Sequence, residues 1–131
     1  MANGTIAFDT LQTSGQIDGT ARSIDTDYLL MGSAKVWINY DSTASSDYTR
    51  DSFNVASTTD HAVGQHDITF SNVMANVNHA GVTNGHRDDN QAISIIHYGQ
   101  SNLFRFKLNA HTSSTNSDSD ATFGAIFGEL A

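Results

Sequence analysis

Apolar and polar residues alternate one by one through several segments of this chain, and no other feature restricts its fold as strongly. In residues 34–40, Ala, Val, Ile and Tyr alternate with Lys, Trp and Asn. In residues 104–108, two Phe and one Leu are separated by Arg and Lys. Successive side chains of a β-strand point to opposite faces of the sheet, so a period of two predicts half-buried strands.

The same reasoning extends to seven short strands. We expect them at residues 34–40, 53–55, 67–71, 75–83, 92–98, 102–108 and 123–127. Residues 58–65 are expected to connect two of them, and the Asn84-Gly85 pair is typical of a tight turn. Ser, Thr and Asn make up 40 of the 131 residues, whereas Lys occurs twice and Glu once. This composition favours strands and turns over helices, and predicts an all-β fold, an antiparallel β-sandwich or jelly roll.

The predicted strands also define a predicted core and one apolar residue outside it. The core set is Val36, Ile38, Phe53, Val55, Ile68, Phe70, Phe104, Phe106, Phe123 and Phe127. Trp37 lies between two inward residues of its strand and therefore points the other way. Contacts between identical subunits are rich in aromatic residues, so Trp37 is a candidate for an oligomer interface.

Residues 1–33 differ from the rest of the chain. Their apolar residues are isolated among Gly, Ser, Thr and Asp, which is too sparse for an independent core. We expect an extended N-terminal arm with a short strand near residues 6–10 and a helical turn within 22–31. The predicted organisation is an arm over 1–33, which docks on another copy or another protein, and a β-sandwich domain over 34–131.

Charge and composition argue against several functions. The net charge is −8, and no Lys/Arg cluster is present to neutralise phosphates, so nucleic acid and anionic membranes are not expected partners. No apolar run approaches the roughly 20 residues that cross a bilayer, and we expect no secretory signal. Cysteine is absent, which removes disulfides, thiolate metal sites and cysteine nucleophiles.

Catalytic patterns are similarly missing. Six histidines are scattered without metal-ligand spacing, and we expect them in loops, exposed or hydrogen-bonded, with no metal. One Glu and turn-forming Asp residues make a poor glycosidase carboxyl pair. No Gly-x-Ser-x-Gly motif is present for a serine hydrolase. The sequence therefore predicts a protein that is not an enzyme and carries no cofactor.

A carbohydrate site is the binding function that the loops support best. Sugar sites combine an aromatic platform with polar groups that orient hydroxyls. Tyr48, Tyr98, His86, Arg87 and Asp88 lie in or beside predicted loops and supply both. These five residues are the candidate ligand site, with a host-surface glycan as the candidate ligand.

Several segments also carry a family resemblance. They read Gly-Ser-Ala-Lys-Val-Trp-Ile-Asn-Tyr (32–40), Arg-Asp-Ser-Phe-Asn-Val (50–55), Asp-Ile-Thr-Phe (67–70), Met-Ala-Asn (74–76) and Ala-Ile-Phe-Gly-Glu-Leu-Ala (125–131). This pattern resembles the C-terminal β-domains of tail-fibre and virion-appendage proteins of tailed bacteriophages, especially marine and cyanobacterial phages. It differs from a long fibre because no helical or repetitive shaft precedes the domain here.

The resemblance implies a function by assembly. It implies a non-enzymatic virion structural protein, a tail-fibre, needle or tail-tip appendage that forms a homo-oligomer, with a trimer favoured. Such a protein is assembled in the host cytoplasm, sits on the virion surface or tail, binds other virion proteins through its arm and contacts the host surface. The alternative is a capsid decoration or cement protein without a ligand.

Overall fold

A computed structural model describes residues 9–12, 23–44, 48–86, 92–110 and 115–131. Of these described residues, 61% lie in strands and one short helix is present, which confirms the all-β prediction. Its residues group into two compact units, Met1–Ser33 and Ala34–Ala131.

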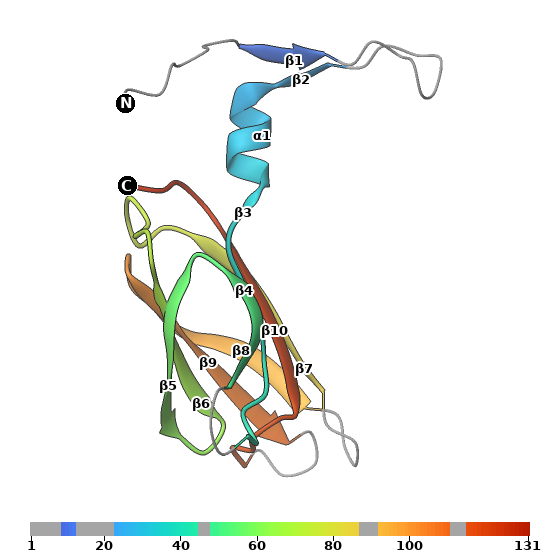
Figure 1. The fold of residues 1–131 in the computed structure, drawn as a ribbon, viewed down its shortest axis with the longest axis vertical. Coiled ribbons are helices and arrows are strands. Elements are labelled where there is room, and N and C mark those ends of the chain that lie inside the picture. The colour runs from blue at the N-terminus through green and yellow to red at the C-terminus, as the bar shows by residue number, and fades with distance from the viewer. Residues whose placement is uncertain (1–8, 13–22, 45–47, 87–91, 111–114) are drawn as a thin grey trace, which may run out of the picture. The chain divides into compact units, whose positions relative to one another are not determined.

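The larger unit is a sandwich of two four-stranded antiparallel sheets (Figure 1). The first sheet has the order β4-β3-β10-β7, with β4 Thr49–Phe53, β3 Ala34–Tyr40, β10 Ala121–Phe127 and β7 Ala80–His86. The second has the order β5-β6-β9-β8, with β5 Val55–Ala62, β6 Gln65–Phe70, β9 Leu103–Ala110 and β8 Ala92–Gly99. In each sheet a late strand, β10 or β9, lies between two earlier ones, so the connections cross between the sheets.

The core lies between the two sheets. Its buried apolar residues are Val36, Ile38, Tyr40, Ile68, Phe70, Met74, Phe104, Phe106, Leu108 and Ile126. Phe106 occupies the centre, stacked on Tyr40 with ring centroids 5.6 Å apart and edge-on to Phe104 at 4.5 Å. Gly124 faces this ring from β10, because a Cβ placed on it would lie 2.1 Å from Cζ of Phe106. Glycine is therefore what allows the aromatic ring to rest on the backbone of β10.

The chain passes from the first sheet to the second at Asn54, between β4 and β5. Asn54 has a φ of 59°, the left-handed region that Asn tolerates better than most residues. Its side-chain amide donates to the carbonyl oxygens of Lys35 and Asn72, each at 3.0 Å, and its Oδ1 accepts from the Asn72 amide at 2.7 Å. One side chain thus ties the corner to β3 and to the end of β6.

The predicted core is right in part. Six of its residues are buried, namely Val36, Ile38, Ile68, Phe70, Phe104 and Phe106, while Val55 and Phe127 are half-buried. Phe53 and Phe123 were expected inside and are exposed, by 53% and 46% of their surface. On β10 the inward residues are Thr122, Gly124 and Ile126, so the face chosen from apolarity was wrong.

Strand boundaries also differ from prediction, most of all in β4, β5 and β7. The strand expected at 53–55 is instead the end of β4, the corner at Asn54 and the start of β5. Residues 58–62 continue β5, and the connection shrinks to a turn at Val63 and Gly64. A side chain at Gly64 would meet the carbonyl oxygen of Leu108 at 2.6 Å, and its φ of 65° suits glycine. The Asn84-Gly85 pair lies inside β7, which begins at residue 80 instead of 75. Polar residues populate these strands because each lies at a sheet edge and faces solvent.

The N-terminal unit contains two short strands and the helix. β1 (Thr10–Gln12) pairs antiparallel with β2 (Ser23–Asp25), and α1 follows over Thr26–Gly32. Asp25 caps the helix by accepting a hydrogen bond from the amide of Asp27 at 2.8 Å. The predicted helical turn is confirmed, whereas the strand expected at 6–10 lies largely outside the described residues. No residue of α1 is buried.

Candidate assembly surface

The strand register gathers apolar side chains on the outer face of the first sheet, the face turned away from the core. Trp37 lies opposite Phe53 on β4 and opposite Ala125 on β10. Ala125 in turn lies opposite Val82 on β7. Side chains directly opposite each other in antiparallel strands have Cβ atoms about 5 Å apart, so these four form one continuous row across the sheet. We call Phe53, Trp37, Ala125 and Val82 the apolar row.

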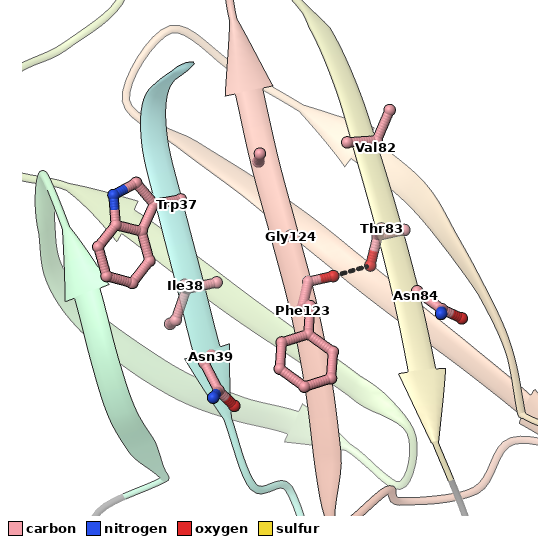
Figure 2. A pocket seen from close by; sticks show the side chains of 9 residues that line it. Trp37, Ile38, Asn39, Val82, Thr83, Asn84, Phe123 and Gly124 are labelled. Carbon is pink, nitrogen blue, oxygen red and sulfur yellow. Dashed lines mark hydrogen bonds between the residues drawn. The ribbon is translucent and has the colours of Figure 1, made fainter. Parts of the chain in front are cut away.

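A second row runs beside it, one pleat further along each strand. Asn39 lies opposite Asp51 on β4 and Phe123 on β10, and Phe123 lies opposite Asn84 on β7. We call these four residues the polar row, although Phe123 adds a third ring to the face. The hydroxyl of Thr83 donates to the carbonyl oxygen of Phe123 at 3.0 Å and ties β7 to β10 at this point (Figure 2).

A groove lies over the β3, β10 and β7 part of these two rows. Its volume is about 490 Å³, and its lining is Trp37, Ile38, Asn39, Val82, Thr83, Asn84, Phe123, Gly124 and Ala125. Figure 2 shows Trp37 and Val82 on opposite sides of β10, which carries only small side chains between them. Trp37 is 38% exposed and Val82 61% exposed, so the walls of the groove are open to a partner.

Charged groups are sparse on this face. Asp51, on the edge strand β4, is the one charged member of the two rows. Lys35, further along β3, is almost fully buried. Arg50 lies on the same edge strand, and its guanidinium donates a hydrogen bond to the carboxylate of Asp41 at 3.0 Å. The middle of the face therefore offers aromatic rings, a methyl group and two amides.

The candidate glycan residues are placed as follows. Tyr48 precedes β4 and is half-buried, packing against the core with its ring 5.9 Å from that of His66. His86 ends β7 in the first sheet, and Tyr98 belongs to β8 in the second. Arg87 and Asp88 lie outside the described residues.

The expectation that the histidines lie in loops is wrong for His61, His66, His86 and His97, which belong to β5, β6, β7 and β8. His66 is also buried. It sits in β6 with 1% of its surface exposed, and its ring is 5.4 Å from that of Tyr40. Its Nε2 lies 3.5 Å from Oδ1 of Asp118. Burial raises the pKa of the Tyr40 phenol, which stays protonated at physiological pH. Within the described ranges, no three His, Asp or Glu side chains converge as a metal site would require.

Sequence reasoning placed Trp37 outside the core but missed its neighbours Phe53, Val82 and Phe123. The available signal was indirect. Ile126 shares its side of β10 with Gly124 and Thr122, and a single glycine in a strand often marks the close approach of another group. If the side of β10 that carries Gly124 is taken as the inward side, Phe123 is predicted to point outward.

Comparison with known protein families, with curated proteins and with solved structures finds no match to this chain. In the part of the chain that the structure describes, α1 is too short and no other helix is long and apolar enough to cross a membrane.

Proposed function

We propose that this protein is a non-enzymatic structural component of a tailed-phage virion, an appendage that assembles as a homo-oligomer and contacts the host surface. One observation carries the proposal. Every large apolar side chain described in the N-terminal unit is exposed, namely Leu11, Ile24, Tyr28, Leu29, Leu30 and Met31. These side chains form an apolar surface that a neighbouring molecule can cover.

The N-terminal unit has little to stabilise it in isolation. Isolated helices shorter than about 12 residues are marginal in water, and so are isolated two-stranded ribbons. α1 has seven residues, and β1 and β2 have three each. Its apolar surface therefore gains most by packing on another chain, which is the role of a docking arm.

The resemblance to virion appendages supports the same proposal from a different direction. Its segment 32–40 contains β3, and its segment 50–55 contains most of β4. Of the three aromatic residues in these segments, Tyr40 is buried in the core, whereas Trp37 and Phe53 lie opposite each other on the outer face. A pattern that retains exposed aromatics fits proteins that act by association, and the resemblance favours a trimer.

Incorporation into particles tests the proposal. Leu30→Asp places a charge on α1, and Val77→Asp places the same charge on a comparably exposed valine in the loop before β7; the parent residues are 56% and 60% exposed. We expect wild type and Val77→Asp in purified virions and Leu30→Asp absent from them, with all three showing the same circular dichroism. Wild-type protein missing from virions would refute the function. Normal incorporation of Leu30→Asp would refute the docking arm.

A further inference from the structure

The apolar row extends across the whole first sheet. Strands lie about 4.8 Å apart, so the row from Phe53 on β4 to Val82 on β7 spans about 14 Å. An aromatic side chain carries roughly 150–250 Å², so the exposed parts of Trp37, Phe53 and Phe123 together present about 200–350 Å². This approaches the largest apolar patches of ordinary monomers, which are often functional. It is also less than the roughly 800 Å² that each partner buries in a stable complex, so it suits the centre of an interface.

Charge indicates which partner this face fits. The chain carries a net charge of −8, so two copies repel each other over most of their surfaces. The two rows contain one carboxylate, Asp51, and it lies on the edge strand. Two copies of an acidic chain can therefore approach along this face with little repulsion. A basic partner would instead be drawn to the acidic remainder of the protein.

The composition of the face points the same way. Interface centres are depleted in Asp, Glu and Lys and enriched in aromatic residues, with polar groups toward the rim. The apolar row has no charge, and the polar row contributes two amides around Phe123. Ala125 lies between Trp37 and Val82 and leaves room for a side chain from another molecule.

From these observations we infer that the outer face of the β4-β3-β10-β7 sheet is the contact through which copies of this chain associate. The inference rests on the proposed oligomeric appendage and assigns its subunit contact. Trp37 and Phe123 form the centre of that contact, and Phe53 and Val82 lie at the two ends of the apolar row. The N-terminal unit is then left to dock the assembly.

The protein supplies its own reporter. Trp37 is the single tryptophan of the chain, so tryptophan fluorescence, excited selectively over the four tyrosines, reports on the outer face alone. For the full-length protein diluted from about 100 μM, we expect the emission maximum to move to longer wavelength as Trp37 is re-exposed. Sedimentation velocity on the same samples should show dissociation over the same concentration range.

Two valine variants separate this face from the rest of the surface. Val82→Asp places a charge on the outer face, and Val63→Asp places the same charge on the β5–β6 turn; the parent side chains are 61% and 59% exposed. Val82→Asp should raise the dissociation constant by at least about a hundredfold, because association would then bury an unpaired carboxylate. Val63→Asp should associate as wild type does.

Two results would overturn the inference directly. One is a wild-type protein that is monomeric at 100 μM, and the other is a Val82→Asp variant that associates as tightly as wild type. A monomer whose Trp37 emission responds to neutral oligosaccharides would overturn it by assigning the face to a glycan. If Val82→Asp is the only one of these variants that dissociates the oligomer, the result supports the inference even when the protein is absent from virions. A failure of the proposed function can therefore be told apart from a failure of this inference. Dissociation by Leu30→Asp alone would move the contact to the N-terminal unit.

Discussion

The contact between Gly124 and Phe106 gives the sharpest test of how the sandwich is packed. In Gly124→Ala the new methyl group would lie 2.1 Å from Cζ and 2.6 Å from Cε1 of Phe106. Carbon atoms in contact prefer about 3.5–4.0 Å, so the ring and the β10 backbone must separate by more than 1 Å. The ring cannot simply turn aside, because it is fully buried between Tyr40 and Phe104.

Overpacking a core costs about 1–3 kcal/mol, and this site belongs at the upper end of that range. We therefore expect Gly124→Ala to lower the free energy of unfolding by about 3 kcal/mol, measured by urea titration followed by circular dichroism. Phe106→Leu shortens the side chain and leaves space for the methyl group. The double variant should be more stable than the sum of the single effects by about 1–2 kcal/mol.

Additive effects, within about 0.5 kcal/mol, would refute this packing argument, because independent sites add and sites in contact do not. A Gly124→Ala variant as stable as wild type would refute it more directly. Gly124 is flanked by Phe123 and Ala125, so a displaced β10 would also disturb the outer face. Association measured on the same variant should therefore weaken together with stability.

Three further predictions concern the fold. The hydrogen bond from Arg105 lowers the pKa of the Asp67 carboxyl. The pair therefore stabilises the fold fully at pH values above the ordinary carboxyl pKa of 3.8, and this stabilisation is lost as the pH falls through the lowered pKa. Asp67→Asn should cost about 1 kcal/mol at pH 7 in urea titrations, with the difference narrowing below pH 4; a constant difference would contradict the linkage. Asn54→Ala should cost about 2–3 kcal/mol by the same titration, and Asn54→Gly clearly less because glycine accepts the positive φ; equal losses would rule out backbone strain as a cause. Phe106→Ala should cost about 3–5 kcal/mol of folding stability, whereas Trp37→Ala should chiefly weaken association, and equal effects on unfolding would move Trp37 into the core.

The sequence predicted the strands whose two faces differ most. Residues 34–40 and 102–108 alternate cleanly, and their inward residues Val36, Ile38, Phe104 and Phe106 are all buried. A link between the strands expected at 92–98 and 102–108 was also predicted, because polar residues and a glycine interrupt two apolar runs, and it lies one residue later than expected, at 100–102. In these segments the alternating pattern and the packing of the sandwich place the same residues inward.

The remainder depends on contacts that no local pattern contains. β10 carries apolar residues on both faces, and the ring of Phe106 reaching across the core selects the side with Gly124. β5 is an edge strand with mostly exposed residues, so its polar sequence looks like a connection. The outer face could not be predicted as a unit, because its residues come from four strands brought together only by register.

That distribution of residues also sets an order of events in time. The pairs β5–β6 and β8–β9 each join neighbours in sequence and can form as local hairpins, whereas β10 must find β3 across most of the domain. Pairings between distant segments form slowly, so we expect the pairing of β3 with β10 to form late. Until β10 inserts between β3 and β7, Trp37 and Val82 do not share a surface. An incompletely folded chain would then lack the proposed contact face, and we expect only folded subunits to associate.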